Sequence, residues 1–139
     1  MVLQLKEQDK QIISKPEDVA ELLRRLLCLE DQLDQDKEHF YCIHLDTRNR
    51  IKLIELVSLG ILNAALVHPR EVFRRAVLEG AAKLLIAHNH PSGQVEPSDA
   101  DLEITKKLRQ AGDILGIPLV DHLIFTQTHH NSLCASTFL

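Results

Sequence analysis

The sequence predicts a single α/β domain in which a mixed β-sheet is flanked by helices. Short apolar segments typical of strands alternate, imperfectly, with longer segments of helical periodicity. The chain has 139 residues, of which 45% are hydrophobic, which suits one domain with a substantial core. No apolar run approaches the length of a membrane span, so no contact with a membrane is expected.

The N-terminal part predicts one helix after a flexible segment. Residues 1–13 are polar and are expected to be flexible, and residues 14–139 are expected to form the domain. Ser14 is the expected N-cap, with Pro16 in the first turn and Glu17 at the capping-box position. Apolar residues at helical spacing continue the helix to Leu27. The acidic residues 30–36 are interpreted as a solvated connector rather than an interaction patch.

The remaining elements follow in order. Residues 39–46 and 51–57 predict two strands joined by a turn. His68-Pro69 opens a helix, and the apolar run 83–88 has no alternation, as expected of a strand covered on both faces. A helix from Ser98 to Leu115 ends before Gly116, and residues 119–126 predict another strand. The side chains expected to face the core from the two helices are Val72, Phe73, Ala76 and Val77, then Leu102, Ile104, Leu108, Ala111 and Leu115.

A histidine pair lies where the 83–88 strand ends. His88 and His90 are two residues apart in an extended segment, so their side chains face the same way. Asp101 follows in the first turn of the next helix, and two imidazoles with one carboxylate suit a three-ligand zinc site that leaves a position for water. The spacing alone leaves metal-binding and structural roles evenly balanced. Locally, Ser98 and Asp101 favour a helix-capping role, which does not exclude metal binding.

Longer motifs around this pair carry a family resemblance. His88-Asn89-His90-Pro91, followed by Ser98 and Asp101, matches the JAMM motif His-x-His-Pro-x6-Ser-x2-Asp of MPN (JAB) metalloproteases. HNHPSG at 88–93, with HPRE at 68–71, AGDILGIP at 111–118 and DH at 121–122, resembles the bacterial RadC family more closely. The resemblance covers residues 14–133. It implies an MPN-type domain with a cytidine-deaminase-like α-β-α arrangement, and Zn²⁺ held by His88, His90, Asp101 and a water.

The resemblance also implies catalytic roles. Ser98 would stabilise the developing oxyanion, and an upstream glutamate would act as general base. Glu55 is the expected base because it lies in the apolar strand IKLIELV, where partial desolvation raises a carboxyl pKa. A water-facing Glu55 on an edge strand is the alternative, and Glu71 at a helix start is the next candidate. The expected reaction is hydrolysis of a peptide or isopeptide-like amide in a peptide or protein substrate.

A second function class is a DNA-repair or DNA-processing accessory, which the RadC resemblance also implies. The net charge of −4, the scattered 16 Lys and Arg and the absence of Trp provide no basic patch or stacking platform for nucleic acid. RadC-like proteins often carry a helix-hairpin-helix region ahead of the domain, and only one short helix is expected here. A metal-binding scaffold without turnover is the third class, against which the intact ligand set argues.

Other features are less specific. The three cysteines are far apart and form no CxxC motif, which favours a reducing cytoplasm. Asp121-His122 is interpreted either as a partner of a ligand imidazole or as structural. His129-His130 is expected to be plain surface rather than a metal site. The last eleven residues depart from the usual RadC ending, so an altered final strand is expected. The sequence indicates neither the particular substrate nor the oligomeric state.

Overall fold

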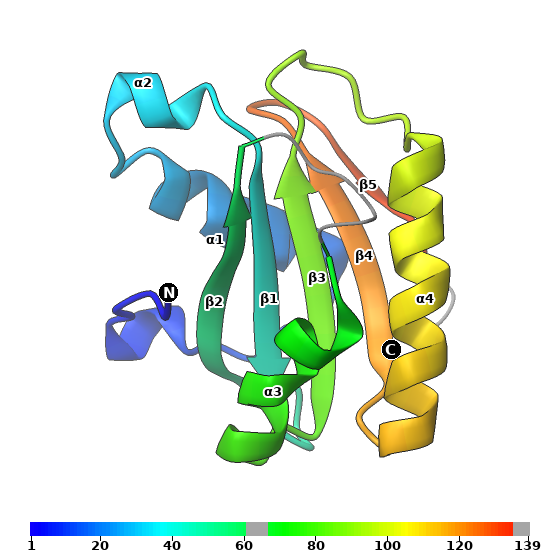
Figure 1. Cartoon of the computed structure of the whole chain (residues 1–139). Coiled ribbons are helices and arrows are strands. Elements are labelled where there is room, and N and C mark those ends of the chain that lie inside the picture. Colours follow the sequence, from blue (N-terminus) through cyan, green and yellow to red (C-terminus); the bar gives the residue numbers. More distant parts are fainter. Residues whose placement is uncertain (61–66, 135–139) are drawn as a thin grey trace.

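A five-stranded mixed sheet forms the middle of the fold, with strand order β2-β1-β3-β4-β5 (Figure 1). The structure is a computed structural model that describes residues 1–60 and 67–134. The strands are β1 (His39–Leu45), β2 (Ile51–Leu59), β3 (Lys83–Asn89), β4 (Leu119–Phe125) and β5 (His130–Ser132). β1 is antiparallel to both β2 and β3, β3 is parallel to β4, and β5 returns antiparallel to β4.

Helices cover both faces of this sheet. They are α1 (Pro16–Leu27), α2 (Gln32–Gln35), α3 (Pro69–Glu79) and α4 (Asp99–Leu115), after a 3-10 turn at Glu7–Asp9. α1 lies on one face, and α3 and α4 lie on the other (Figure 1). The expected single α/β domain with an α-β-α arrangement is therefore confirmed. Within the described residues, no helix has the length and apolar character needed to cross a membrane.

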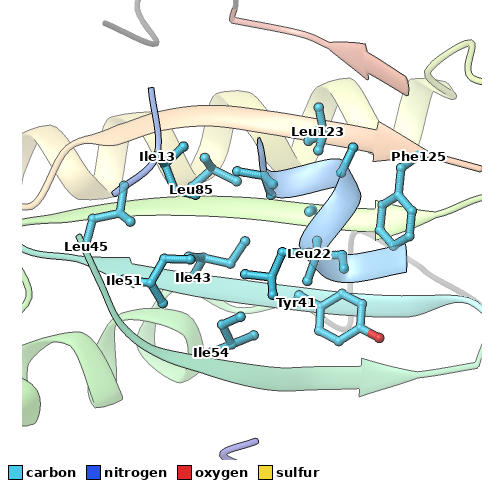
Figure 2. Packing of buried hydrophobic residues seen from close by; sticks show 14 residues of the cluster. Ile13, Leu22, Tyr41, Ile43, Leu45, Ile51, Ile54, Leu85, Leu123 and Phe125 are labelled. Atoms are coloured by element: carbon cyan, nitrogen blue, oxygen red, sulfur yellow. The ribbon is translucent and has the colours of Figure 1, made fainter. Parts of the chain in front are cut away.

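Alternation along the strands divides the core into two clusters. Tyr41 and Ile43 of β1 pack with α1 residues such as Leu22 (Figure 2). Phe40 and Cys42 point to the opposite face and pack in the cluster formed with α3 and α4. Every residue of β1 is buried, because both of its faces are covered and it lies between two other strands. β3 is an apolar run for the same reason, since it also lies between two strands and is covered on both faces.

The start of α1 differs from the expectation. Lys15, not Ser14, is the N-cap, so Pro16 is the first helical residue and Asp18 is the third. The Asp18 carboxylate accepts hydrogen bonds from the backbone N–H groups of Ser14 and Lys15 at 2.9 and 3.2 Å. Asp18 therefore takes the position that was assigned to Glu17, because the helix begins one residue later than expected.

The N-terminal segment lies against the open edge of β2. Val2 forms an antiparallel bridge with Glu55, and the Leu3 N–H donates to the Ile54 carbonyl at 2.9 Å. Further along, Ile13 is 1% exposed. Backbone hydrogen bonds make up much of this contact, and they leave little trace in side-chain composition. The segment covers part of a sheet edge that would otherwise expose unpaired backbone groups.

Several smaller expectations are also corrected. The connector at 30–36 contains the short helix α2. Val77, Leu102 and Leu115 are 60%, 49% and 50% exposed rather than inward. In α4 the buried stripe is formed by Asp101, Ile104, Thr105, Leu108 and Gly112, so Leu102 is rotated away from the sheet. The tail contributes only the three-residue strand β5, in the region where an altered final strand was expected, and residues 135–139 lie outside the described part.

Gly112 fixes how closely α4 approaches β4. A Cβ atom at this position would lie 2.5 Å from the Ile117 carbonyl oxygen and 3.3 Å from the Leu119 nitrogen. The Ile117 N–H in turn donates to the Gly112 carbonyl at 3.0 Å. The chain therefore turns back tightly from α4 into β4, which seats the helix that carries Asp101.

Candidate metal centre

The structure brings His88, His90 and Asp101 together where the end of β3 meets the start of α4. His88 Nε2 lies 2.9 Å from His90 Nε2 and 3.2 Å from Asp101 Oδ1, and His90 Nε2 lies 3.4 Å from Asp101 Oδ2. One potential ligand atom from each residue lies within 4.8 Å of the others. His88 and Asp101 are buried, whereas His90 is partly exposed, so the cluster is open on one side.

Asp101 performs the capping role and faces the histidines at the same time. Its Oδ2 accepts a hydrogen bond from the Ser98 N–H at 2.9 Å, and its own N–H donates to Ser98 Oγ at 3.1 Å. Burial alone would raise the pKa of Asp101, but the His88 side chain and the Ser98 N–H hold it well below its ordinary value. The carboxylate is therefore negative, and the two interpretations of Asp101 hold together.

The donor set fits a divalent cation. His90 Nδ1 lies 2.9 Å from the Gln94 carbonyl oxygen, which can only accept, so Nδ1 carries the ring proton of a neutral His90. The unprotonated His90 Nε2 then faces the Asp101 carboxylate and His88. Two imidazoles and one carboxylate are a set that zinc takes at catalytic sites, with a further position for water.

His122 lies directly behind His88. Its Nε2 is 2.8 Å from His88 Nδ1, and its Nδ1 is 2.6 Å from the Thr105 hydroxyl. Burial, followed by the nearby His88, lowers the pKa of His122 well below its ordinary value, so this ring is neutral. The choice between the two interpretations of Asp121-His122 is thus resolved for His122, which contacts a ligand imidazole.

Asp121 has a different role. Its carboxylate accepts hydrogen bonds from the backbone N–H groups of His122 and Cys134 at 2.8 and 2.9 Å, and from the Ser132 hydroxyl. These contacts attach the segment around β5 to β4. Of these two adjacent residues, His122 therefore contacts the candidate metal cluster, whereas Asp121 binds the tail.

The structure does not bring Glu55, the expected general base, to the cluster. Glu55 of β2 lies opposite Cys42 of β1, which lies opposite Ile86 of β3. This register separates Glu55 from His88 by about 10 Å across two strand spacings and about 7 Å along the sheet. One Glu55 oxygen lies 3.8 Å from Arg75 Nε on α3, and the other has no hydrogen-bond partner among the described residues.

Glu38 lies beside the cluster, as does Glu96, and sequence reasoning missed Glu38 as a candidate base. It comes directly before β1, whose first residues pair with the end of β3, so the antiparallel register places it near His88. A hollow of about 290 Å³ is lined by Glu38, His90, Ser92, Gln94, Glu96, Ser98 and Asp101. In the sequence, Glu38 is only a glutamate next to a predicted strand. Its position near the histidines becomes visible once the pairing of that strand is known.

Asn89 holds the backbone on both sides of Glu38. Its Oδ1 accepts from the His39 N–H at 2.6 Å, and its Nδ2 donates to the Lys37 carbonyl at 3.0 Å. The Gly60 N–H donates to the carbonyl of Glu38 itself at 2.8 Å. The residue between the two histidines of the cluster therefore positions the segment that carries Glu38.

A larger hollow is also lined by His90. Its volume is about 630 Å³, and it lies between the end of α1, the loop after β3 and the end of β4. The lining combines apolar and polar side chains, including Leu27, Cys28, Pro91, Phe125 and Thr128. Both hollows reach His90, so there is room for a bound molecule beside the cluster.

The tail histidines do not join the cluster. His130 Nε2 lies 3.4 Å from Glu17, and the His129 carbonyl accepts from Arg24 at 2.8 Å. Across residues 1–60 and 67–134, the group of His88, His90 and Asp101 is the one metal-ligand set of this kind. No disulfide joins the three cysteines in the described part of the chain.

The fold and the cluster together define a three-layer α/β domain with a candidate divalent-metal centre of the kind found in hydrolases. The chain belongs to the RadC-like JAB domain family, whose family model matches residues 13–138. This confirms the resemblance that was drawn from the sequence motifs.

Relatives of the chain come from diverse organisms. The chain is 43% identical over 126 residues to a UPF0758 protein of Syntrophomonas wolfei, covering 91% of this chain and 53% of that protein. It is 52% identical over 95 residues to a UPF0758 protein of Pelodictyon phaeoclathratiforme, covering 68% and 43%. A UPF0758 protein of Methanosarcina mazei is 43% identical over 127 residues, covering 91% and 53%. The chain spans about half the length of the curated relatives it matches.

Proposed function

We propose that this domain is a zinc-dependent hydrolase of the JAMM type that cleaves peptide or isopeptide-like amide bonds. The observation that carries the proposal is the convergence of His88, His90 and Asp101 beside a hollow that Glu38 and Ser98 also line. Such a site combines metal ligands, a potential base and a hydroxyl donor within reach of one bound group. Membership of the JAB family, whose domains are generally hydrolase-like, supports the same reaction class.

His88, His90 and Asp101 would hold the zinc, which when bound supplies Lewis acidity that polarises a carbonyl and lowers the pKa of water to about 7. The Glu38 carboxylate would accept a proton from the attacking water and deliver it to the leaving nitrogen. The Ser98 oxygen already accepts from the Asp101 N–H, which leaves its hydroxyl proton available for the developing oxyanion. The cap thus aims the Ser98 hydroxyl as well as stabilising α4.

Glu38 replaces Glu55 as the proposed base. A general base must lie within hydrogen-bond reach of the proton it takes, directly or through one water. Glu38 shares a hollow with His90, Ser98 and Asp101, whereas Glu55 is two strands from His88 and faces Arg75. The apolar sequence around Glu55 is accounted for by its place beside Arg75 of α3.

A peptide or protein substrate remains our proposal for the occupant of the site. The hollow of about 630 Å³ beside His90 has a mixed apolar and polar lining, which suits a peptide segment better than a highly charged ligand. The net charge of −4 does not favour nucleic acid, so the DNA-processing alternative gains no support from the site.

Zinc analysis with paired glutamine variants tests the proposal. Wild type, Glu38→Gln and Glu55→Gln should each bind one zinc per chain, while His88→Ala and Asp101→Ala should lose it. A library of internally quenched peptides should be cleaved by wild type and Glu55→Gln, but about 10²–10⁴-fold more slowly by Glu38→Gln. Loss of cleavage in Glu55→Gln with normal turnover by Glu38→Gln would return the base to Glu55. A wild type that binds no zinc would refute the proposed function.

A further inference from the structure

We infer that Thr105 and His122 form a buried hydrogen-bond relay that fixes the tautomer of His88 and keeps the lone pair of its Nε2 turned toward the cation. The inference deepens the proposed function and rests on it for the identity of the cation. His122 and Thr105 are positioning residues, because they act on the site through His88 and do not touch the reacting atoms.

The backbone carbonyl of Asp101 determines the donor and acceptor roles along the relay. Thr105 lies one turn after Asp101 in α4, and its hydroxyl donates to the Asp101 carbonyl at 2.9 Å. A carbonyl oxygen can only accept, so this bond uses the one proton of the hydroxyl. The 2.6 Å contact between Thr105 Oγ1 and His122 Nδ1 must then carry the proton of the imidazole.

The same count of available protons determines which nitrogen donates between His122 and His88. A neutral imidazole has one N–H, so a proton on His122 Nδ1 leaves Nε2 as an acceptor. Its partner at 2.8 Å, His88 Nδ1, must therefore donate, which leaves Nε2 of a neutral His88 free to bind the cation. That atom lies 3.2 Å from Asp101 Oδ1 and 2.9 Å from His90 Nε2, in the position required of a metal ligand.

The reverse polarity is disfavoured at both ends of the relay. The Thr105 oxygen would face the Asp101 carbonyl oxygen at 2.9 Å with no proton between them. At the other end His88 would carry its proton on Nε2, pointing at the cation. His88 and His122 are fully buried and Thr105 is 8% exposed, so solvent has little access to exchange these partners.

The relay also joins ligands from separate elements. It begins at the backbone of Asp101 in α4, passes through His122 of β4 and ends at His88 of β3. A helix that shifts away from the sheet would break the Thr105 contact and release the tautomer of His88. Zinc affinity should therefore depend on the seating of α4, beyond the contribution of Asp101 as a ligand.

Paired variants separate the relay from simple packing. Thr105→Val keeps the shape but removes the hydroxyl, and it should weaken zinc binding by about 10–100-fold, as loss of a ligand's outer hydrogen-bond partner typically does. Thr105→Ser restores the hydroxyl and should bind zinc within a few-fold of wild type. His122→Gln can accept from His88 and donate to Thr105, so it should bind more tightly than His122→Leu. Affinities would be measured by competition with a zinc chelator, after thermal melts confirm folding.

Imidazole ¹⁵N NMR on the zinc-free wild type tests the tautomers without relying on zinc or turnover. His122 should carry its proton on Nδ1, and His88 should keep a proton on Nδ1 beside any proton that its Nε2 shares with Asp101 before zinc binds. A proton on Nε2 of His122, the absence of a proton on Nδ1 of His88, or unchanged zinc affinity in folded Thr105→Val would overturn the relay. A wild type that binds no zinc would defeat the proposed function, while the NMR result would still decide the tautomer. If Thr105→Val fails to fold, the comparison of His122→Gln with His122→Leu and the wild-type NMR spectrum still test the relay.

Discussion

Replacing His44 with leucine should stabilise the domain, and the gain should grow as the pH falls. His44 lies in β1 and is fully buried, and neither ring nitrogen has a hydrogen-bond partner among the described residues. Burial lowers the pKa of His44 from 6.5 to about 4, opposed by Glu79 and reinforced by Arg75 and Lys52. The folded protein therefore holds this imidazole neutral where an exposed histidine would be protonated.

The size and sign of the effect follow from proton linkage. Below pH 6.5 the unfolded chain binds a proton at His44, but the folded chain does so only near pH 4, so the free energy of unfolding decreases across this window. A pKa difference of about 2.5 corresponds to about 3 kcal/mol when the window has been crossed fully. Leucine removes this loss, and it also removes a buried polar ring without partners, worth about 1 kcal/mol at neutral pH.

Urea unfolding of zinc-free protein at pH 7.5 and pH 4.5 provides the assay. His44→Leu should exceed wild type by about 1 kcal/mol at pH 7.5 and by a further 2–3 kcal/mol, roughly, at pH 4.5. His129→Leu is the matched control, because His129 is exposed and should show no such extra gain. An advantage for His44→Leu that is equal at the two pH values would mean that His44 has the same pKa in both states, and the reasoning from burial would be refuted.

Three further predictions concern the site and its support. Asp101→Asn should retain α4 by circular dichroism, because the amide oxygen still accepts from the Ser98 N–H, yet zinc analysis should find the metal lost. Ser98→Ala should do the opposite. It should keep zinc, while urea unfolding should show that the free energy of unfolding falls by about 1 kcal/mol. Asn89→Ala should leave zinc binding intact and lower kcat by about 10²-fold through misplacement of Glu38, and an unchanged kcat would contradict the clamp. Gly112→Ala should cost about 1–3 kcal/mol in urea unfolding because its Cβ would meet the Ile117 carbonyl, and undiminished stability would show that the turn into β4 adapts.

Features encoded by neighbouring residues were predictable from the sequence. The apolar runs of β1, β2, β3 and β4 and the glycine after α4 gave the α/β class, because periodicity and caps act within a few residues. The candidate metal cluster was predictable for a similar reason. His88, His90 and Asp101 lie within one strand–loop–helix unit, so their spacing along the chain constrains their spacing in the fold.

Features that depend on strand pairing were not predictable in this way. Glu38 and His88 are fifty residues apart, and the pairing of Phe40 with His88 brings them together. Glu55 has the stronger local signal for a desolvated carboxylate, but α3 and Arg75 supply its surroundings. The contacts of residues 1–13 with β2 were not predictable for another reason. Many of them are backbone hydrogen bonds, which do not depend on side-chain identity.

The position of Asn89 between the two histidines has a mechanical consequence. His88 and His90 are two of the proposed metal ligands, and the residue that connects them hydrogen-bonds to the peptide groups on either side of Glu38. A displacement of this tripeptide would move the ligands and the glutamate in the same direction, so their separation would survive bending of the sheet. For protein engineering, the smallest transferable part of this site is therefore the tripeptide together with the paired start of β1 and the start of α4, because grafting the three proposed ligands alone would leave the proposed base behind.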